Sequence, residues 1–295
     1  MVNIYNIRNG KRWVKESTPI SGSVKSRFGN AALRCGDFIA HKFGDALHGK
    51  TYFIPSYINY AVPVSEKQML GNIPYGTYIS LDPHAKNVLA IDWMNWENRR
   101  TDLDFHCTTP FNDYGWNGAH CGDGMTFSGD WTDATNGAAE AYRFMLREDE
   151  PLIFSVSNFN RISGAEFRFG LMEEQRYHNR VTEIESPIFP PIPLKFSNED
   201  CPEAMTLGIV YNDKFYFYGG SLGTDIVPKR DMYRGALEAI IHRSMNQMKF
   251  AELISMCGGQ VVRNEAECTS DTISLAPADL TTRTFFDILN MIDPI

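Results

Sequence analysis

The sequence TLGIVYNDKFYFY, residues 206–218, is the clearest fold signal in this chain. Residues 206–211 and 214–218 are rich in β-branched and aromatic side chains, which favour strands. Asn212 and Asp213 between them are turn-forming residues. The stretch therefore predicts an antiparallel hairpin.

Further strand signals lie on the amino-terminal side of this hairpin. They are short apolar stretches separated by turn formers: residues 78–81, 88–93, 152–159 and 166–172. Residues 186–194 carry four prolines, so we expect a crossing between sheets there rather than a central strand. Many short strands at this spacing are typical of a sandwich or barrel. We predict a mainly β fold, a two-sheet β-sandwich over residues 73–227.

The flanks of the predicted sandwich have a different character. Residues 1–72 predict an α+β segment, with a hairpin around Asn9 and Gly10 and a helix over residues 30–47. Residues 228–295 predict a helical carboxy-terminal unit, with helices over residues 230–248, 249–256 and 282–291.

Composition limits the class of protein. The 295 residues are 43% hydrophobic, which is enough for a real core, and the formal net charge is −8. That charge argues against a general nucleic-acid or membrane surface, although a local basic patch is compatible with it. The six cysteines are scattered, no apolar run approaches 18 residues, and the first residues do not resemble a secretory signal. We expect a cytoplasmic location, in a bacterium or in an infected host cell.

A group of acidic residues is the candidate site. Asp102 and Asp104 are two residues apart and would share one face of a strand. Two adjacent carboxylates repel each other unless a cation lies between them, and hard divalent cations take six to eight oxygen ligands. Asp130, Asp133 and Glu140, on a stretch rich in small residues, are candidates for the remaining oxygens.

Two other interpretations of these residues stay open. The acids are also compatible with solvated strand ends and turns, where carboxylates are common. His106, Cys107, His120 and Cys121 have the ligand chemistry of a zinc site, but neighbouring residues in a strand point to opposite faces. The sequence has no Gly-x-Ser-x-Gly elbow and no phosphate-binding loop, so we do not predict an enzyme.

These motifs, in this order, resemble the TerD-like domain of tellurite-resistance and general stress proteins. The resemblance rests on a strand ending at Trp93, the Asp-Leu-Asp motif at 102–104, the Ser-Gly-Asp motif at 128–130, and Gly137 to Glu140. It extends to the segments that flank this domain in the longer bacterial TerD-like proteins, and covers roughly residues 45–270.

The resemblance implies a Ca²⁺-binding β-sandwich without catalytic activity. By position, it implies that Asp102, Asp104 and Asp130 are the main ligands, with Asp133 and Glu140 second. The commonest family pattern has two aspartates where Ala138 and Ala139 stand, so we expect one Ca²⁺ ion rather than two.

The expected role is a protein–protein interaction module in stress response or in a phage–host setting. We expect no membrane, nucleic-acid or small-molecule partner. The alternative is a structural assembly protein, such as a viral shell or virion component, whose terminal appendages exchange between subunits.

Overall fold

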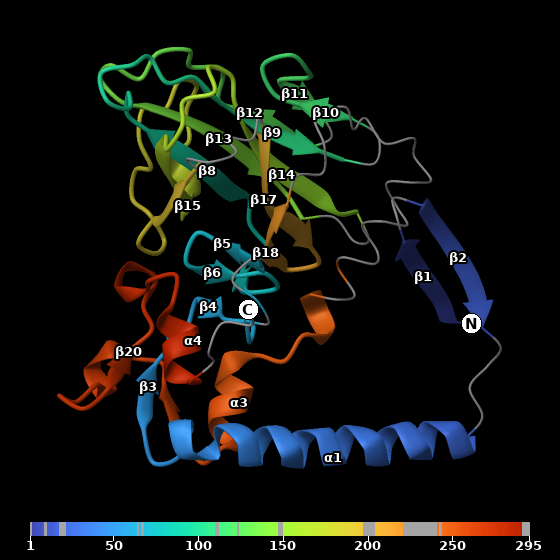
Figure 1. Ribbon diagram of the computed structural model, residues 1–295. Helices are drawn as coiled ribbons and strands as arrows, with labels where there is room; N and C mark the ends of the chain where they lie inside the picture. Colours follow the sequence, from blue (N-terminus) through green and yellow to red (C-terminus); the bar gives the residue numbers. More distant parts are fainter. Residues whose placement is uncertain are drawn as a thin grey trace.

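The computed structural model shows a mainly β protein built around two stacked sheets (Figure 1). It describes residues 2–8, 11–17, 22–63, 65, 68–109, 112–122, 124–146, 150–196, 204–220, 241 and 244–290. The predicted fold class is confirmed.

The larger sheet has seven strands in the order β10-β9-β14-β17-β18-β7-β4. Their bounds are β4 (Ile58–Asn59), β7 (Tyr78–Ser80), β9 (Leu103–Thr108), β10 (Asp113–Tyr114), β14 (Leu152–Asn158), β17 (Ala204–Tyr211) and β18 (Lys214–Gly220). All its neighbouring strands are antiparallel. The predicted hairpin at 206–218 is confirmed, because Tyr211 pairs with Lys214 across the Asn212–Asp213 turn.

The second sheet has six strands in the order β11-β12-β13-β8-β15-β16. Their bounds are β8 (Asn87–Trp93), β11 (Cys121–Gly122), β12 (Met125–Phe127), β13 (Ala138–Phe144), β15 (Glu166–Met172) and β16 (Ile192–Lys195). Strand β8 lies at its centre, paired with β13 on one side and β15 on the other. All seven residues of β8 are buried, which explains why the sequence shows no alternation there.

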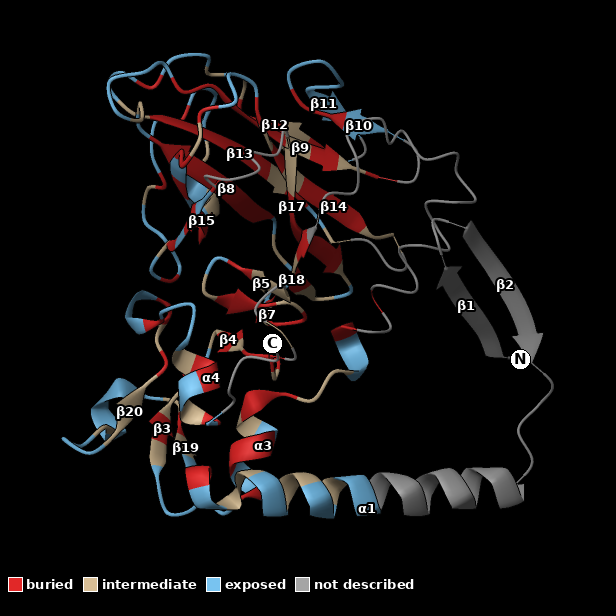
Figure 2. Cartoon of the chain, viewed as in Figure 1, coloured by how far each residue is buried: buried red, intermediate tan, exposed pale blue. Residues whose placement is uncertain are grey.

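Aromatic side chains from both sheets belong to one buried core. Figure 2 shows that much of β8, β13 and β14 is buried. The rings of Phe105 from β9 and Tyr142 from β13 lie 5.1 Å apart, centre to centre. Phe169 from β15 and Phe215 from β18 make a similar contact at 4.8 Å. Because each pair joins one sheet to the other, the rings hold the two layers face to face, where such contacts add to the hydrophobic stabilisation.

The other elements lie at one end of the sandwich and beside it (Figure 1). They are β1 (Val2–Arg8), β2 (Lys11–Ser17), α1 (Gly22–Leu47), β3 (Thr51–Phe53), β5 (Met69–Leu70), β6 (Ile73–Pro74), η2 (Glu174–Arg176), α3 (Phe250–Met256), β19 (Gln260–Val262), η3 (Glu265–Glu267), β20 (Ile273–Ser274), η4 (Pro277–Asp279) and α4 (Thr284–Ile288). The hairpin around residues 9–10 is confirmed as β1–β2. Helix α1 begins eight residues earlier than the periodicity predicted, at Gly22 instead of residue 30.

The carboxy-terminal unit contains a small sheet that the sequence pattern did not reveal. Strand β3 pairs in parallel with β19 and with β20, so residues 51–53 of the amino-terminal segment belong to the same sheet as residues 260–262 and 273–274. Strand β4 instead joins the sandwich. The two predicted flanks are thus interleaved, and the domain boundaries at 72 and 227 stay predictions. Most of the helix predicted over residues 230–248 lies outside the described residues.

Lys249 connects this unit to the sandwich. Its buried ammonium group donates hydrogen bonds to the backbone oxygens of Gly76 and Ser244, each at 2.9 Å. Burial lowers the pKa of Lys249 to about 8, because its charged ammonium group has lost water and is bonded to neutral acceptors.

No helix in the described parts of the chain is long and apolar enough to cross a membrane.

Candidate metal centre

The centre begins where strand β9 enters the larger sheet. Asp102 immediately precedes β9, and Asp104 is its second residue. Leu103 and Phe105 belong to the core between the sheets. The strand alternation therefore sends the two carboxylates to the opposite face from Leu103 and Phe105, as the sequence predicted.

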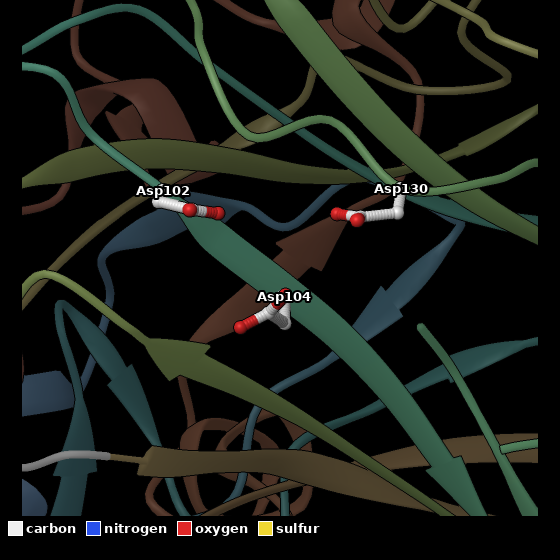
Figure 3. A group of neighbouring side chains, drawn as sticks. All are labelled: Asp102, Asp104 and Asp130. Atoms are coloured by element: carbon white, nitrogen blue, oxygen red, sulfur yellow. The ribbon is translucent and has the colours of Figure 1, made fainter. Parts of the chain in front are cut away.

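Asp130 reaches the same place from the loop between β12 and β13. Each of Asp102, Asp104 and Asp130 offers one carboxylate oxygen, and these oxygens all lie within 4.8 Å of one another. Figure 3 shows Asp102 and Asp130 pointing toward each other, with Asp104 between them on the strand. Of the residues that the structure describes, these three form the one cluster with the chemistry and spacing of metal ligands.

The cluster lacks a full set of partners for its charges. Asp102 is 4% exposed, and its Oδ1 atom is buried without a hydrogen-bond partner. Its Oδ2 atom accepts one hydrogen bond, of 3.3 Å, from Arg100. A buried, unpartnered carboxylate oxygen is costly and requires an explanation, such as an ion that binds there.

Burial and mutual repulsion shift the acidity of both strand carboxylates. Burial, opposed by Arg100 and reinforced by Asp130, raises the pKa of Asp102 to about 6. Burial, reinforced by Asp102 and Asp130, raises the pKa of Asp104 to about 7. The shifts show that the ionised cluster is unfavourable without a cation, because nearby like charges in a dry site disfavour ionisation.

Glu140 lies beside the cluster but is occupied by the backbone. It is fully buried on β13 and accepts hydrogen bonds from the backbone nitrogens of Phe105, at 2.7 Å, and Trp131, at 3.1 Å. Burial raises the pKa of Glu140 well above its usual range, partly opposed by these two donors. Glu140 thus ties β13, β9 and the loop that carries Asp130 together. It fixes the geometry of the three aspartates.

The structure does not bring Asp133 into the cluster. Its Oδ1 atom accepts hydrogen bonds from the Asn95 side chain and from the backbone and hydroxyl of Thr135. The Thr135 and Asn95 side chains hold the pKa of this exposed carboxyl below its usual value. Asp133 therefore organises the loop, and its role as a metal ligand stays a prediction without structural support.

Ala138 and Ala139 face different sides of β13. Ala138 belongs to the core between the sheets, whereas Ala139 lies on the opposite face, packed with Val181 and Ile184. Both are fully buried in apolar surroundings. No second group of acidic ligands forms among the described residues.

The histidine–cysteine alternative is not assembled as a metal site in the described residues. Cys107 is fully buried in the core, while the half-buried His106 lies on the other face of β9. His120 and Cys121 are exposed and line a depression of about 560 Å³ beside Asp130.

Sequence reasoning missed Arg100, which is the cation nearest to the centre. Its guanidinium donates to Asp102 and, through Nε, to the backbone oxygen of Thr132. The signal was present, since Arg99 and Arg100 come directly before the Asp-Leu-Asp motif. Arg100 is more than half exposed, so it compensates only part of the buried charge.

Comparison with known proteins does not identify the chain. No family model matches, and no curated protein sequence matches. Among solved structures, one similar chain is described as the unknown function protein SAV2460, at 13% sequence identity and a TM-score of 0.30. The alignment covers 47% of this chain and 89% of that chain. At this TM-score the likeness supports no function, and the TerD-like resemblance stays a prediction.

Proposed function

We propose that this chain is a non-catalytic, Ca²⁺-binding β-sandwich protein. The observation that carries the proposal is the group formed by Asp102, Asp104 and Asp130, with one buried carboxylate oxygen lacking any partner. A protein that keeps such a group at a fixed position accepts a cost in stability, and a divalent cation removes that cost when it binds.

Ca²⁺ fits this donor set better than zinc or magnesium. All three side chains offer oxygen, whereas zinc sites are typically built from cysteine and histidine. Ca²⁺–oxygen distances of about 2.3–2.6 Å allow ligands on opposite sides of the ion to be almost 5 Å apart. Mg²⁺ requires a tighter octahedron, with about 4 Å between opposite ligands. Backbone carbonyls and water would complete the shell.

The role that we propose follows from this chemistry and from the TerD-like resemblance. A bound ion would join the start of β9 to the β12–β13 loop and fix the surface that these segments present. The protein would act in the cytoplasm by binding a protein partner, in stress response or in a phage–host setting. No group among the described residues provides a nucleophile, a base and a positioned acid at this centre, so we do not propose a reaction.

Titration calorimetry on chelator-stripped protein tests the proposal. We expect wild-type protein to bind one Ca²⁺ ion and the Asp104→Asn variant to bind none. Asp133→Asn is the matched control, because Asp133 lies on the same loop as Asp130 but outside the cluster. It should retain binding. Absence of Ca²⁺ heat with wild-type protein, or its persistence in Asp104→Asn, contradicts the proposal.

A second proposal, self-assembly, rests on a different observation. Phe38 of α1 is 65% exposed, which leaves an apolar ring uncovered on the flanking helix. If it packs in another subunit, the oligomer should be lost in Phe38→Ser. Light scattering after size exclusion measures this directly, and a wild-type monomer at high concentration contradicts assembly.

A further inference from the structure

An exposed aromatic side chain is attached directly to the metal centre. Phe159 is 65% exposed, and its backbone N–H donates a hydrogen bond of 3.0 Å to the backbone oxygen of Asp102. Phe159 follows β14, whose last residue, Asn158, is fully buried. A large apolar ring is thus held in solvent beside a carboxylate that we assign to the metal.

Side-chain hydrogen bonds hold the turn that carries Phe159. The Asn158 side chain donates to the backbone oxygen of Ile162 and accepts from its backbone nitrogen, both at 3.0 Å. The side-chain amide of Asn160 donates to the backbone oxygen of Arg100 at 2.8 Å. The position of Phe159 relative to the centre is therefore held by buried hydrogen bonds of Asn158 on one side and an exposed hydrogen bond of Asn160 on the other.

Exposed arginines surround the same centre. Arg100 bonds to Asp102, Arg161 lies two residues after Phe159, and the guanidinium of Arg180 lies 5.7 Å from the Trp131 ring centre. Arg161 and Arg180 have positive φ angles, of 51° and 62°, where glycine or asparagine would cost less.

A depression lies beside Asp130. It has a volume of about 560 Å³, and Asp130, Arg180 and His120 are among the residues that line it. The depression is large enough for a phosphate-bearing headgroup, with an arginine on its wall and a metal ligand at its edge. Arginine and a divalent ion are both good partners for phosphate oxygens.

The charge of this surface depends on the metal. The carboxylates of Asp102, Asp104 and Asp130 carry negative charge, and Arg100 compensates only part of it. A divalent ion adds two positive charges. The whole chain carries −8, so it is not drawn to anionic surfaces in general.

We propose that the metal-loaded centre docks on an anionic phospholipid membrane. A headgroup phosphate would lie between the ion, Arg180 and the depression, while the Phe159 ring enters the lipid interface. The inference rests on the proposed function, because the docking surface forms only when Ca²⁺ binds.

The geometry favours a lipid surface over a protein segment. Phe159 projects from a turn and is not among the residues that line the depression beside Asp130, whereas a bound peptide usually needs a groove for its side chains. A single projecting apolar ring surrounded by cationic groups is the pattern of interfacial membrane binding.

Co-sedimentation of the full chain with vesicles tests this inference. We expect binding to vesicles that contain phosphatidylserine in the presence of Ca²⁺, and neither in chelator nor with phosphatidylcholine alone. Raising the salt concentration should weaken it, because part of the attraction is electrostatic. Soluble phosphoserine, tested as a separate arm, should bind much more weakly than the vesicles.

Three variants separate this inference from the metal proposal. Phe159→Ser should retain Ca²⁺ heat in calorimetry but lower vesicle affinity about tenfold, since it removes the inserted ring. Phe38→Ser removes a ring of equal exposure from α1 and should leave vesicle affinity unchanged. Arg180→Gln should lower vesicle affinity about fivefold with Ca²⁺ binding intact.

Each contrary result has a distinct meaning. Wild-type protein that binds Ca²⁺ but not anionic vesicles overturns the membrane inference and leaves the proposed function standing. Equal vesicle binding in chelator overturns the role of the metal in docking. Binding of phosphoserine without binding of vesicles would overturn membrane docking and indicate a soluble ligand. If the chain does not bind vesicles but binds another protein in a way that requires Phe159, the docking surface is for a protein partner.

Discussion

Two buried carboxylate regions of this sandwich differ in how their charge is compensated. Asp92 on β8 is 3% exposed, and Asp102 and Asp104 at the start of β9 are 4% and 5% exposed. Asp92 receives both Nε and Nη2 of Arg168, the former at 2.8 Å, and the backbone nitrogen of Ile184 at 2.9 Å. Asp102 has one long bond to Arg100 and an oxygen with no partner.

The comparison shows how to separate a structural acid from a functional one. The Arg168 fork matches the Asp92 carboxylate in both charge and geometry, so Asp92 needs nothing from outside. The Asp102 group holds three carboxylates with one half-exposed arginine in contact. Its missing partner is the basis of the metal proposal, and the predictions below test the contrast from the largest expected effect to the smallest.

Breaking the ion pair between Asp92 and Arg168 should have the largest effect on stability. Asp92→Asn removes the charge that Arg168 faces, and we expect a loss of about 3 kcal/mol in unfolding free energy, at the low end for buried pairs because Arg168 is half-exposed. Urea unfolding followed by tryptophan fluorescence measures it. Glu166→Gln, an exposed acid on the same strand as Arg168, is the control. A loss equal to that of the control would mean that the pair is not structural.

Binding of Ca²⁺ should stabilise the region around Asp102 and Asp104. At a Ca²⁺ concentration of 100 times the dissociation constant, we expect about 2.7 kcal/mol of added stability in wild-type protein, because the ion binds only the folded state. Asp92→Asn should show the same gain, since Asp92 is not one of the three carboxylates that we propose bind the ion. Denaturant unfolding with Ca²⁺ and with chelator provides the difference. Identical curves in both buffers for wild-type protein would exclude a folded-state metal site.

Glu140 tests whether a buried acid with two backbone donors behaves like the compensated Asp92 or like the uncompensated Asp102. Glu140→Gln keeps the shape but replaces one acceptor oxygen by an amide donor, so one of the two backbone N–H groups of Phe105 and Trp131 loses its partner. We expect a loss of about 2 kcal/mol in chelator, the cost of an unsatisfied buried donor. Thermal unfolding shows whether this holds. A gain in unfolding free energy in Glu140→Gln would mean that the charge of Glu140 is uncompensated, like that of Asp102.

Removing one uncompensated charge should have the opposite sign. In chelator, Asp104→Asn should raise the unfolding free energy by about 1 kcal/mol, because it relieves burial and repulsion. The same variant should gain nothing from Ca²⁺. Denaturant unfolding in both buffers tests both parts, with Asp133→Asn as the loop control. A destabilised Asp104→Asn protein in chelator would show that the carboxylate already has its partner.

The pH dependence should show the smallest effect. The pKa of Asp104 rises from 3.8 in the unfolded chain to about 7 in the folded protein, and that of Asp102 rises from 3.8 to about 6. A raised carboxyl pKa contributes stability that is complete below pH 4 and is lost as the pH rises through 6 and 7. In chelator, the advantage of Asp104→Asn over wild-type should therefore shrink as the pH falls from 7 to 5, because wild-type Asp104 becomes protonated in the folded protein. An advantage independent of pH would refute the shift.

Local patterns predicted much of the fold because secondary structure has a local cause. The hairpin at 206–218 has a turn flanked by β-favouring residues, and β17 and β18 form there. Strand alternation likewise placed Asp102 and Asp104 on one face. Strand β8 was predicted from its apolar run, although burial on both faces removes the alternation. The β3–β19–β20 sheet joins segments about 200 residues apart, so no local pattern predicted it.

The sequence by itself determined which residues can form strands, and that two carboxylates share one strand face. Only the tertiary structure decided that Asp130 joins them while Asp133, three residues later, does not. The physical reason is competition for hydrogen bonds. Asn95 and Thr135 occupy the Asp133 carboxylate, and no donor among the described residues reaches Asp102 Oδ1. Such partners come from distant strands, so the difference between a satisfied acid and an uncompensated one exists only in the folded chain.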